Sequence, residues 1–433
     1  MPAPAPPAGA PQAGRYDPYA PLRLPAFRRY VLGLLALSIA TQVQGVVVAW
    51  QIYAVTRDPL SLGLIGLAEA LPFIGFALWA GHVADRVDRR RLAIAATVVL
   101  VLCSAALLLL AMRPPWLPLA PARHVPAIYA IIVASGVARS FLQPARQAWS
   151  AELVPRSLLP SAITWRSVTW QIAAVGGPAL GGLLYALVGP AQAYALDTAL
   201  MAVALLAFWA VRHVAPPRTR AHESVRRSLA EGIAFLRGQP VLLGAMTLDL
   251  FSVFFGGATA LLPVFAAEIL HVGPEGLGVL RAAPAAGAVL VSLWLAHRPP
   301  VRRTGPVLLG AIAIFGLAMI GFGLSRSYPL SLALLAVSGA VDMVSVNIRS
   351  LLLQLLVPDR LLGRVASVNQ IFIGSSNEIG AFESGVAARL LGTVASVVFG
   401  GVATLAVVGA TAARVPALRR LRAIQPVPES LAA

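Results

Sequence analysis

Long apolar blocks recur along the whole of this sequence, and they constrain its fold more than any other feature. A helix of about 20 apolar residues crosses a hydrocarbon layer about 30 Å thick. The chain is 58% hydrophobic and only 12% charged, which is about half the charge of a typical soluble domain. We therefore predict an all-α membrane protein with twelve spans, at 30–55, 60–83, 91–112, 126–148, 161–188, 190–211, 241–268, 276–297, 305–325, 328–355, 365–391 and 392–413.

One polar stretch, residues 212–240, divides the twelve predicted spans into two sets of six. It is too charged to cross a membrane, and it predicts a short amphipathic helix on the membrane surface. The predicted organisation is a disordered tail, a six-helix bundle, the linker, a second six-helix bundle and a second tail, at 1–25, 26–211, 212–240, 241–414 and 415–433.

Arginine is concentrated on alternate loops. It is abundant in both tails and in 86–91, 212–237 and 298–303, whereas 188–193 and 326–329 are almost uncharged. Cytoplasmic loops carry the excess of basic residues, so we expect a multi-pass plasma-membrane protein with both termini in the cytoplasm. The net charge of +17 does not indicate a nucleic-acid partner, because the arginines lie between apolar blocks rather than in one basic domain.

The two halves of the sequence also resemble each other. ARQAWSAELVPRSLL (145–159) aligns with IRSLLLQLLVPDRLL (348–362) at an offset of 203 residues, and GLAEALP (66–72) aligns with GVLRAAP (278–284) at an offset of 212. Each match is weak alone, but both have the same order and nearly the same spacing. We interpret them as a duplication that produced two pseudo-symmetric six-helix bundles. Parallel repeats of this kind are typical of secondary transporters, whose substrate site lies near the membrane midplane between the halves.

The loop that follows the second predicted span is unusually charged. Its sequence GHVADRVDRRR (81–91) resembles the signature loop of the major facilitator superfamily, except that Asp88 stands where the family has glycine. The resemblance implies twelve helices in two bundles and a charged latch that holds one conformation of the transporter. The latch residues would be Gly81, Asp85, Arg86, Arg89 and Arg90.

In the fifth predicted span, GGPALGG (176–182) resembles the antiporter motif of the same superfamily, which favours export over import. Two glycines of the longer motif are absent upstream, and a generic packing seam of small residues is the alternative interpretation. The second half resembles a bacterial branch that includes siderophore exporters of the enterobactin type and macrolide-type efflux proteins. The matching motif residues are Gly177, Pro178, Gly181 and Gly182.

Several ionisable residues fall inside the predicted spans. Such a residue costs at least about 2.5–3.5 kcal/mol to insert at the centre of a bilayer, so a functional role is the default expectation. Static ion pairs are the alternative. The candidates for proton coupling or for lining a substrate cavity are Glu69, Arg139, Asp249, Asp342, Glu378 and Glu383, and Asp197 is a further mid-span acid.

We therefore predict a secondary active transporter that exports a small amphipathic molecule, such as a siderophore, antibiotic or metabolite, by proton antiport with alternating access. An importer or facilitator on the same fold is the alternative. We expect no enzymatic activity, cofactor or metal, because the sequence has no Walker motif, nucleophile elbow or cluster of metal ligands. The expected partners are the substrate, protons and the lipid bilayer of a bacterial plasma membrane, and we expect a monomer.

Overall fold

A computed structural model describes residues 17–114, 121–212, 225–256, 258–298 and 303–421. Most of the predicted N-terminal tail, most of the first part of the linker and the last twelve residues lie outside the described residues. Every regular element within the described ranges is a helix.

The elements before the linker are α1 (Ala20–Arg23), α2 (Pro25–Thr56), α3 (Pro59–Arg86), α4 (Arg89–Met112), α5 (Pro121–Glu152), η1 (Arg156–Leu158), α6 (Leu159–Val188) and α7 (Pro190–Trp209). The elements from the linker onward are α8 (Val225–Arg237), α9 (Pro240–Phe255), η2 (Ala258–Leu261), α10 (Leu262–Val264), η3 (Phe265–Ile269), α11 (Gly273–Ala296), α12 (Thr304–Leu324), α13 (Tyr328–Leu356), α14 (Asp359–Leu391), α15 (Thr393–Arg414) and α16 (Pro416–Arg419). Proline begins several of these helices, where its missing N–H and fixed φ cost nothing.

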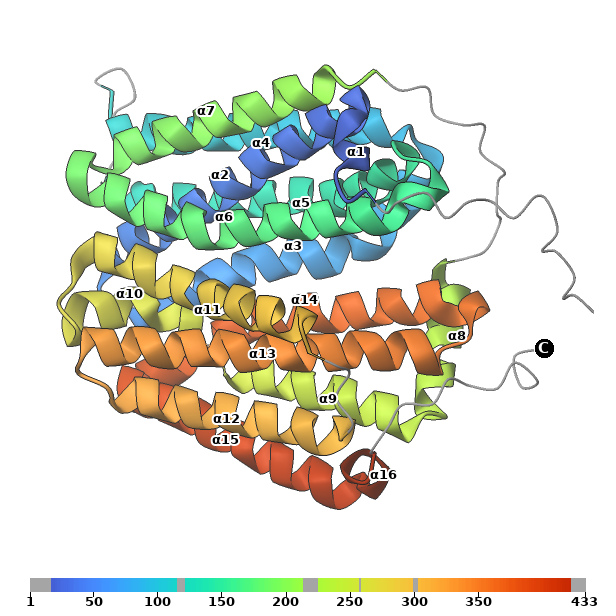
Figure 1. Ribbon diagram of the computed structural model, residues 1–433. Helices are drawn as coiled ribbons and strands as arrows, with labels where there is room; N and C mark the ends of the chain where they lie inside the picture. The colour runs from blue at the N-terminus through green and yellow to red at the C-terminus, as the bar shows by residue number, and fades with distance from the viewer. Residues whose placement is uncertain (1–16, 115–120, 213–224, 257, 299–302, 422–433) are drawn as a thin grey trace, which may run out of the picture.

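The long helices form two groups that lie against each other (Figure 1). In the first half, α2 packs against α6 and α7, α4 packs against α5 and α7, and α3 packs against α5. In the second half, α12 packs against α13 and α15, α11 packs against α13, and α14 packs against α9. The two halves meet along two pairs of helices, α3 with α14 and α6 with α11. The short helices α1, α8 and α16 lie at one end of the molecule, which we call the terminal end.

Eleven helical segments in the described residues are long and apolar enough to cross a membrane. They correspond to eleven of the twelve predicted spans. The remaining prediction, 365–391, falls on α14, which has 33 residues but a more polar sequence. The all-α membrane fold in two bundles is confirmed, and a count of twelve crossings stays a prediction.

The predicted span at 241–268 corresponds to a candidate membrane span, Pro240–Ile269, but it is not one continuous helix. Helix α9 ends at Phe255, and the chain continues through the 3₁₀ turn η2, the short α10 and the π-helix η3. At Gly256 a side chain would overlap the Phe315 ring, because a Cβ there would lie 2.5 Å from its Cε1 atom. Pro263 is the second residue of α10 and has no N–H to donate to the preceding turn. Hydropathy alone cannot detect such a break, because the segment stays apolar throughout.

One tight turn recurs at the corresponding position of each half. Gly189 follows α6 and Gly392 follows α14, with φ values of +87° and +88°, and they are separated by the same 203 residues as Arg146 and Arg349. A positive φ of this size favours glycine, which has no Cβ. The repeated glycines therefore mark the same turn in each half.

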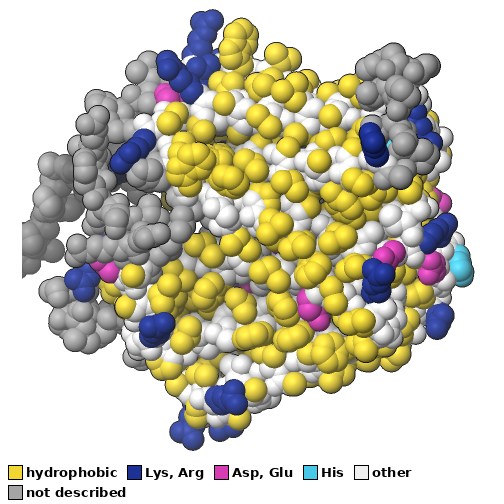
Figure 2. Space-filling view, turned by 180° about the vertical axis from the view of Figure 1, so that it is seen from behind, with side chains coloured by type: hydrophobic (Ala, Val, Ile, Leu, Met, Phe, Trp, Pro, Cys, Tyr) yellow, Lys and Arg dark blue, Asp and Glu magenta, His cyan; other side chains and the backbone are white. Residues whose placement is uncertain are grey.

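The surface has the pattern expected of a protein surrounded by lipid. Figure 2 shows a face covered mainly by hydrophobic side chains, with most of the basic side chains toward its two ends. Large apolar side chains such as Leu390 and Leu187 are 77% and 71% exposed. Exposure of this extent would be unfavourable in water and is favourable in hydrocarbon.

Candidate functional site

Four charged side chains from both halves meet where the halves touch. Glu69 lies on α3 and Arg139 on α5 in the first half, and Arg281 lies on α11 and Glu378 on α14 in the second half. Each interacts electrostatically with charges of the opposite half. We call this set the central quartet.

The central quartet combines an ion pair with two neighbouring carboxyl groups. Arg139 Nη2 lies 2.6 Å from Glu69 Oε1, and Glu378 interacts electrostatically with Glu69, Arg139 and Arg281. Arg281 Nη1 donates to the carbonyl oxygen of Gly45 at 3.1 Å. The side chains of Arg139 and Glu69 keep 31% and 30% of their surface exposed, so both are accessible to a small molecule or to water.

The internal repeat relates these charges with their signs reversed. The offset of 212 residues aligns Glu69 with Arg281, and the offset of 203 aligns Arg139 with Asp342. The acid Glu69 thus corresponds to the base Arg281, and the base Arg139 corresponds to the acid Asp342. Of the two aligned pairs, Glu69 and Arg281 attract each other across the halves, whereas Asp342 interacts with Arg349 in its own half. Sequence reasoning overlooked Arg281, although the repeat alignment contained the signal.

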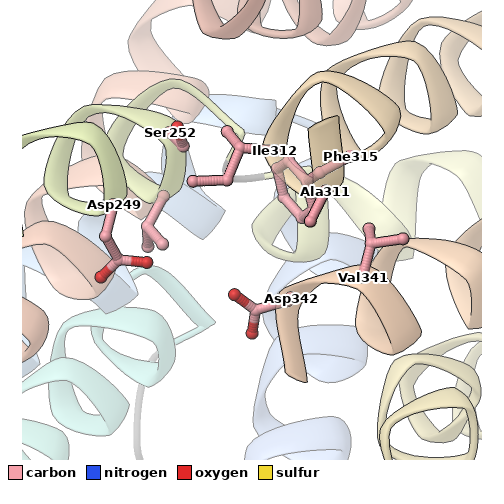
Figure 3. A pocket seen from close by; sticks show the side chains of 8 residues that line it. Asp249, Ser252, Ala311, Ile312, Phe315, Val341 and Asp342 are labelled. Carbon is pink, nitrogen blue, oxygen red and sulfur yellow. The ribbon is translucent and has the colours of Figure 1, made fainter. Parts of the chain in front are cut away.

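A second group of charges lies within the second half. Asp249 on α9 forms an ion pair with Arg349 on α13, with 2.5 Å between Oδ2 and Nη1, and both side chains are less than 10% exposed. Asp342 lies two turns before Arg349 on α13 and interacts electrostatically with it. Asp249 and Asp342 flank a cavity of about 10 Å³ (Figure 3), which is room for about one water molecule. Two acids therefore share one arginine here.

Asp197 on α7 is fully buried inside the first half. Its Oδ2 atom accepts hydrogen bonds from Gln44 Nε2 at 3.1 Å and from the Ser104 hydroxyl. Its Oδ1 atom has no hydrogen-bond partner among the described residues. The sequence indicated a mid-span acid at this position, and the structure surrounds it with neutral donors rather than arginines.

Of the six mid-span residues predicted from the sequence, the structure brings three together in the central quartet and two in the Asp249 group. Glu383 joins neither. It lies five residues beyond Glu378 on α14, so it projects from another face of the helix. Among the described residues, no group of three or more His, Cys, Asp or Glu side chains is placed to hold a metal ion.

The glycines of GGPALGG (176–182) pack α6 against two partners. A Cβ on Gly177 would lie 2.6 Å from Gln42 Cβ, and one on Gly181 would lie 3.0 Å from the carbonyl oxygen of Val43, both on α2. A Cβ on Gly182 would lie 2.9 Å from the Cα atom of Gly278 on α11. Pro178 also takes part, because a Cβ on Gly278 would lie 2.5 Å from the Pro178 carbonyl oxygen. The motif therefore packs the first half internally and joins it to the second half.

The charged loop at 81–91 joins α3 to α4. Arg89 forms an ion pair with Glu152 at the end of α5, at 2.7 Å. Asp88, which departs from the family pattern, caps α4 by accepting a hydrogen bond from the Arg91 N–H at 2.8 Å, a preferred role for aspartate at a helix start. Arg86 is exposed, a Cβ on Gly81 would meet no described atom within 4 Å, and the Asp85 side chain lies outside the described part of the structure.

Further contacts between the halves lie at the end opposite the terminal end. The Tyr53 hydroxyl donates to Glu268, and Arg389 Nη1 lies 3.2 Å from Asp58 Oδ2. Beside them α3 and α14 touch closely, because a Cβ on Gly63 would lie 3.0 Å from the Cα atom of Gly385. These contacts join the two halves at this end, and the central quartet joins them at midspan.

The chain is similar to known exporters along most of its length. The enterobactin exporter EntS of Citrobacter koseri is 27% identical over 406 residues, which cover 94% of this chain and 95% of that protein. The enterobactin exporter EntS of Shigella flexneri is 28% identical over 375 residues, which cover 86% of this chain and 87% of that protein.

Solved transporter structures share the fold. A bacterial homologue of the human lysosomal transporter Spinster, in an inward-facing and unoccupied conformation, aligns with a TM-score of 0.67 at 15% identity, covering 94% of this chain and 98% of that one. A point mutant of the nucleoside transporter NupG aligns with a TM-score of 0.69 at 12% identity, covering 90% of this chain and 99% of that one. Residues 16–431 match the family described as transmembrane secretion effector. The chain therefore belongs to the transmembrane secretion effector family of the major facilitator superfamily, whose members are membrane transporters.

Proposed function

We propose that this transporter exports a small amphipathic molecule of the siderophore kind in exchange for protons. The observation that carries the proposal is the meeting of two acids, Glu69 from one half and Glu378 from the other, beside Arg139 and Arg281. Two neighbouring carboxylates repel each other, which favours a proton on one of them. We infer that the central quartet binds a proton at the place where the two halves meet.

The location of this pair couples the proton to movement of the halves. Glu69 belongs to the first half and Glu378 to the second, so separating the halves along α3 and α14 moves the two carboxyl groups apart. The carboxyl groups then meet water from the other side and can exchange the proton there. Acidic residues inside membrane bundles commonly serve as such proton relays.

Alternating access requires contacts that form in one state and break in the other. The Tyr53–Glu268 hydrogen bond and the Asp58–Arg389 ion pair close the end opposite the terminal end. We infer that the arginine-rich loop at 81–91 closes the terminal end in the opposite state, with Asp85, Arg86, Arg89 and Arg90 as the latch. Rocking of two repeats around a midplane site is the usual mechanism of such folds.

The substrate class follows from two observations. The relatives that cover most of the chain are enterobactin exporters, and the central quartet offers partly exposed charges of both signs inside an apolar bundle. A molecule that carries polar groups on an apolar frame can contact both the charges of the central quartet and the apolar side chains around them.

Transport in proteoliposomes with an imposed pH gradient tests the proposal, with enterobactin as the probe. The wild-type protein should accumulate the probe against its gradient and stop when a protonophore collapses the pH gradient. Glu378→Gln keeps the size of the side chain but cannot release a proton, so proton-driven accumulation should be lost while exchange of labelled for unlabelled probe continues. Glu383→Gln is the matched control on the same helix and should behave like the wild type.

Other outcomes would assign a different mechanism. Probe movement that ignores the collapsed gradient would indicate a facilitator, and movement in the same direction as protons would indicate an importer. Unchanged accumulation in Glu378→Gln, or an equal loss in Glu383→Gln, would remove the central quartet from the coupling mechanism.

A further inference from the structure

A basic hollow lies on the first half at the terminal end, apart from the central quartet. It has a volume of about 570 Å³, and its lining residues are Arg29, Arg90, Trp209, Ala210 and Arg212. Arg29 comes from the start of α2, Arg90 from the start of α4, and the other three from the end of α7 and the residues directly after it. Three helices thus bring three guanidinium groups to one place, and no acid is among the described residues that line the hollow.

Two of these arginines are already positioned by the backbone of the α7 end. Arg29 Nη1 donates to the Ala210 carbonyl oxygen at 3.0 Å, and Arg90 Nη2 donates to the Trp209 carbonyl oxygen at 2.7 Å. These bonds satisfy carbonyl groups that a helix end leaves free and place positive charge beside its negative pole. Each guanidinium has five N–H donors, so most remain available, and the buried Nε atom of Arg90 has no hydrogen-bond partner among the described residues.

The chemistry of the hollow favours a phosphate group. Three positive charges repel one another, and an anion between them removes that repulsion. Guanidinium groups match the geometry of phosphate oxygens, to which they can donate two parallel hydrogen bonds. An anion that binds here would therefore gain both charge neutralisation and several N–H donors.

The surroundings point to a lipid rather than to a free anion. The Trp209 side chain is 68% exposed, and tryptophan is enriched where a membrane meets water. The hollow lies at the end of crossing helices α2, α4 and α7, which is the level of lipid headgroups. Basic pockets between membrane helices are known to bind anionic headgroups. We propose that the Arg29–Arg90–Arg212 hollow binds the phosphodiester headgroup of an anionic phospholipid.

Native mass spectrometry of the delipidated full-length protein, titrated with phosphatidylglycerol, tests this assignment. The wild type should bind phosphatidylglycerol much more tightly than phosphatidylcholine, and inorganic phosphate should not compete. Removing an arginine near an anionic lipid should weaken binding about fivefold, so Arg29→Gln/Arg212→Gln should weaken it about 25-fold. Arg90 is left unchanged because it belongs to the proposed latch.

The matched control is Arg419→Gln/Arg420→Gln, which removes two exposed arginines at the same end of the second half. This control should bind phosphatidylglycerol like the wild type. An equal loss in the control would show binding by general surface charge and overturn the proposal. Competition by inorganic phosphate would assign the hollow to a free anion, and equal wild-type affinity for the two lipids would refute a headgroup site even if the double variant failed to fold.

Discussion

Adding one methyl group at Gly182 should shift the conformational equilibrium of the transporter. Gly182 on α6 faces Gly278 on α11, and the two helices belong to different halves. A Cβ at Gly182 would lie 2.9 Å from both the Cα and the N atoms of Gly278, and it would also overlap the Pro274 carbonyl oxygen. These are backbone atoms, which cannot rotate away as a flexible side chain can. Gly182→Ala therefore forces the two halves apart at this point.

The size of the effect follows from the cost of overpacking. Inserting a methyl group into a well-packed site costs about 1–3 kcal/mol. The cost applies only to the conformation in which α6 and α11 touch, so it becomes a difference between states. A difference of that size changes an equilibrium constant about 5- to 150-fold. The population that is open at the end opposite the terminal end should rise by this factor.

Distance measurements by electron paramagnetic resonance can detect the shift. Val188 is the last residue of α6 and Leu391 is the last residue of α14, and both are exposed. Spin labels at these two positions therefore report the distance between the halves at the end opposite the terminal end. The single native cysteine, Cys103, is buried and is replaced by alanine in the background protein. Gly182→Ala should increase the fraction of long distances between the labels.

Gly177→Ala supplies the matched control within the same motif. Its Cβ would lie 2.6 Å from Gln42 Cβ on α2, which is a contact inside the first half and is present in both conformations. This variant should lower thermal stability without changing the distance distribution. If Gly182→Ala also left the distances unchanged, the seam between α6 and α11 would not distinguish the two states, and the reasoning would be refuted.

Two predictions concern buried polar groups in the separate halves, both measured as free energies of unfolding in mixed micelles. Arg349→Met leaves the buried Asp249 carboxylate without its cation and should lower the free energy of unfolding by about 3–5 kcal/mol. The double variant Asp249→Leu/Arg349→Met removes both charges and should lose clearly less stability. An equal loss in both variants would show that the unpaired carboxylate is not the source of the destabilisation. Asp197→Asn keeps an acceptor for Gln44 and Ser104 and should be nearly neutral. Asp197→Leu leaves the buried Ser104 hydroxyl and the partly buried Gln44 amide without this acceptor, which should cost about 1–3 kcal/mol for the hydroxyl. Similar stability of the two Asp197 variants would contradict the role of those hydrogen bonds.

The mid-span residues show how far the sequence could predict the site. Hydropathy indicated that Glu69, Arg139 and Glu378 fall inside spans, because a charge within an apolar block is visible in the sequence alone. Their meeting in one quartet depends on how α3, α5, α11 and α14 pack. Glu383 shows the converse, since it satisfied the same sequence criterion and lies apart on α14. Arg281 met the same criterion, because it lies inside the predicted span 276–297, and the repeat aligns it with Glu69.

The sequence by itself determined that this chain is a set of membrane helices in two related halves. This holds because a backbone in lipid must satisfy its own hydrogen bonds within each segment, so helix and span are local properties that the apolar blocks and the repeat reveal. The tertiary structure alone decided which charges pair across helices, such as Glu69 with Arg139 and Asp249 with Arg349. Those outcomes depend on contacts between segments far apart in the chain, and the energies of such contacts exist only once the helices have packed.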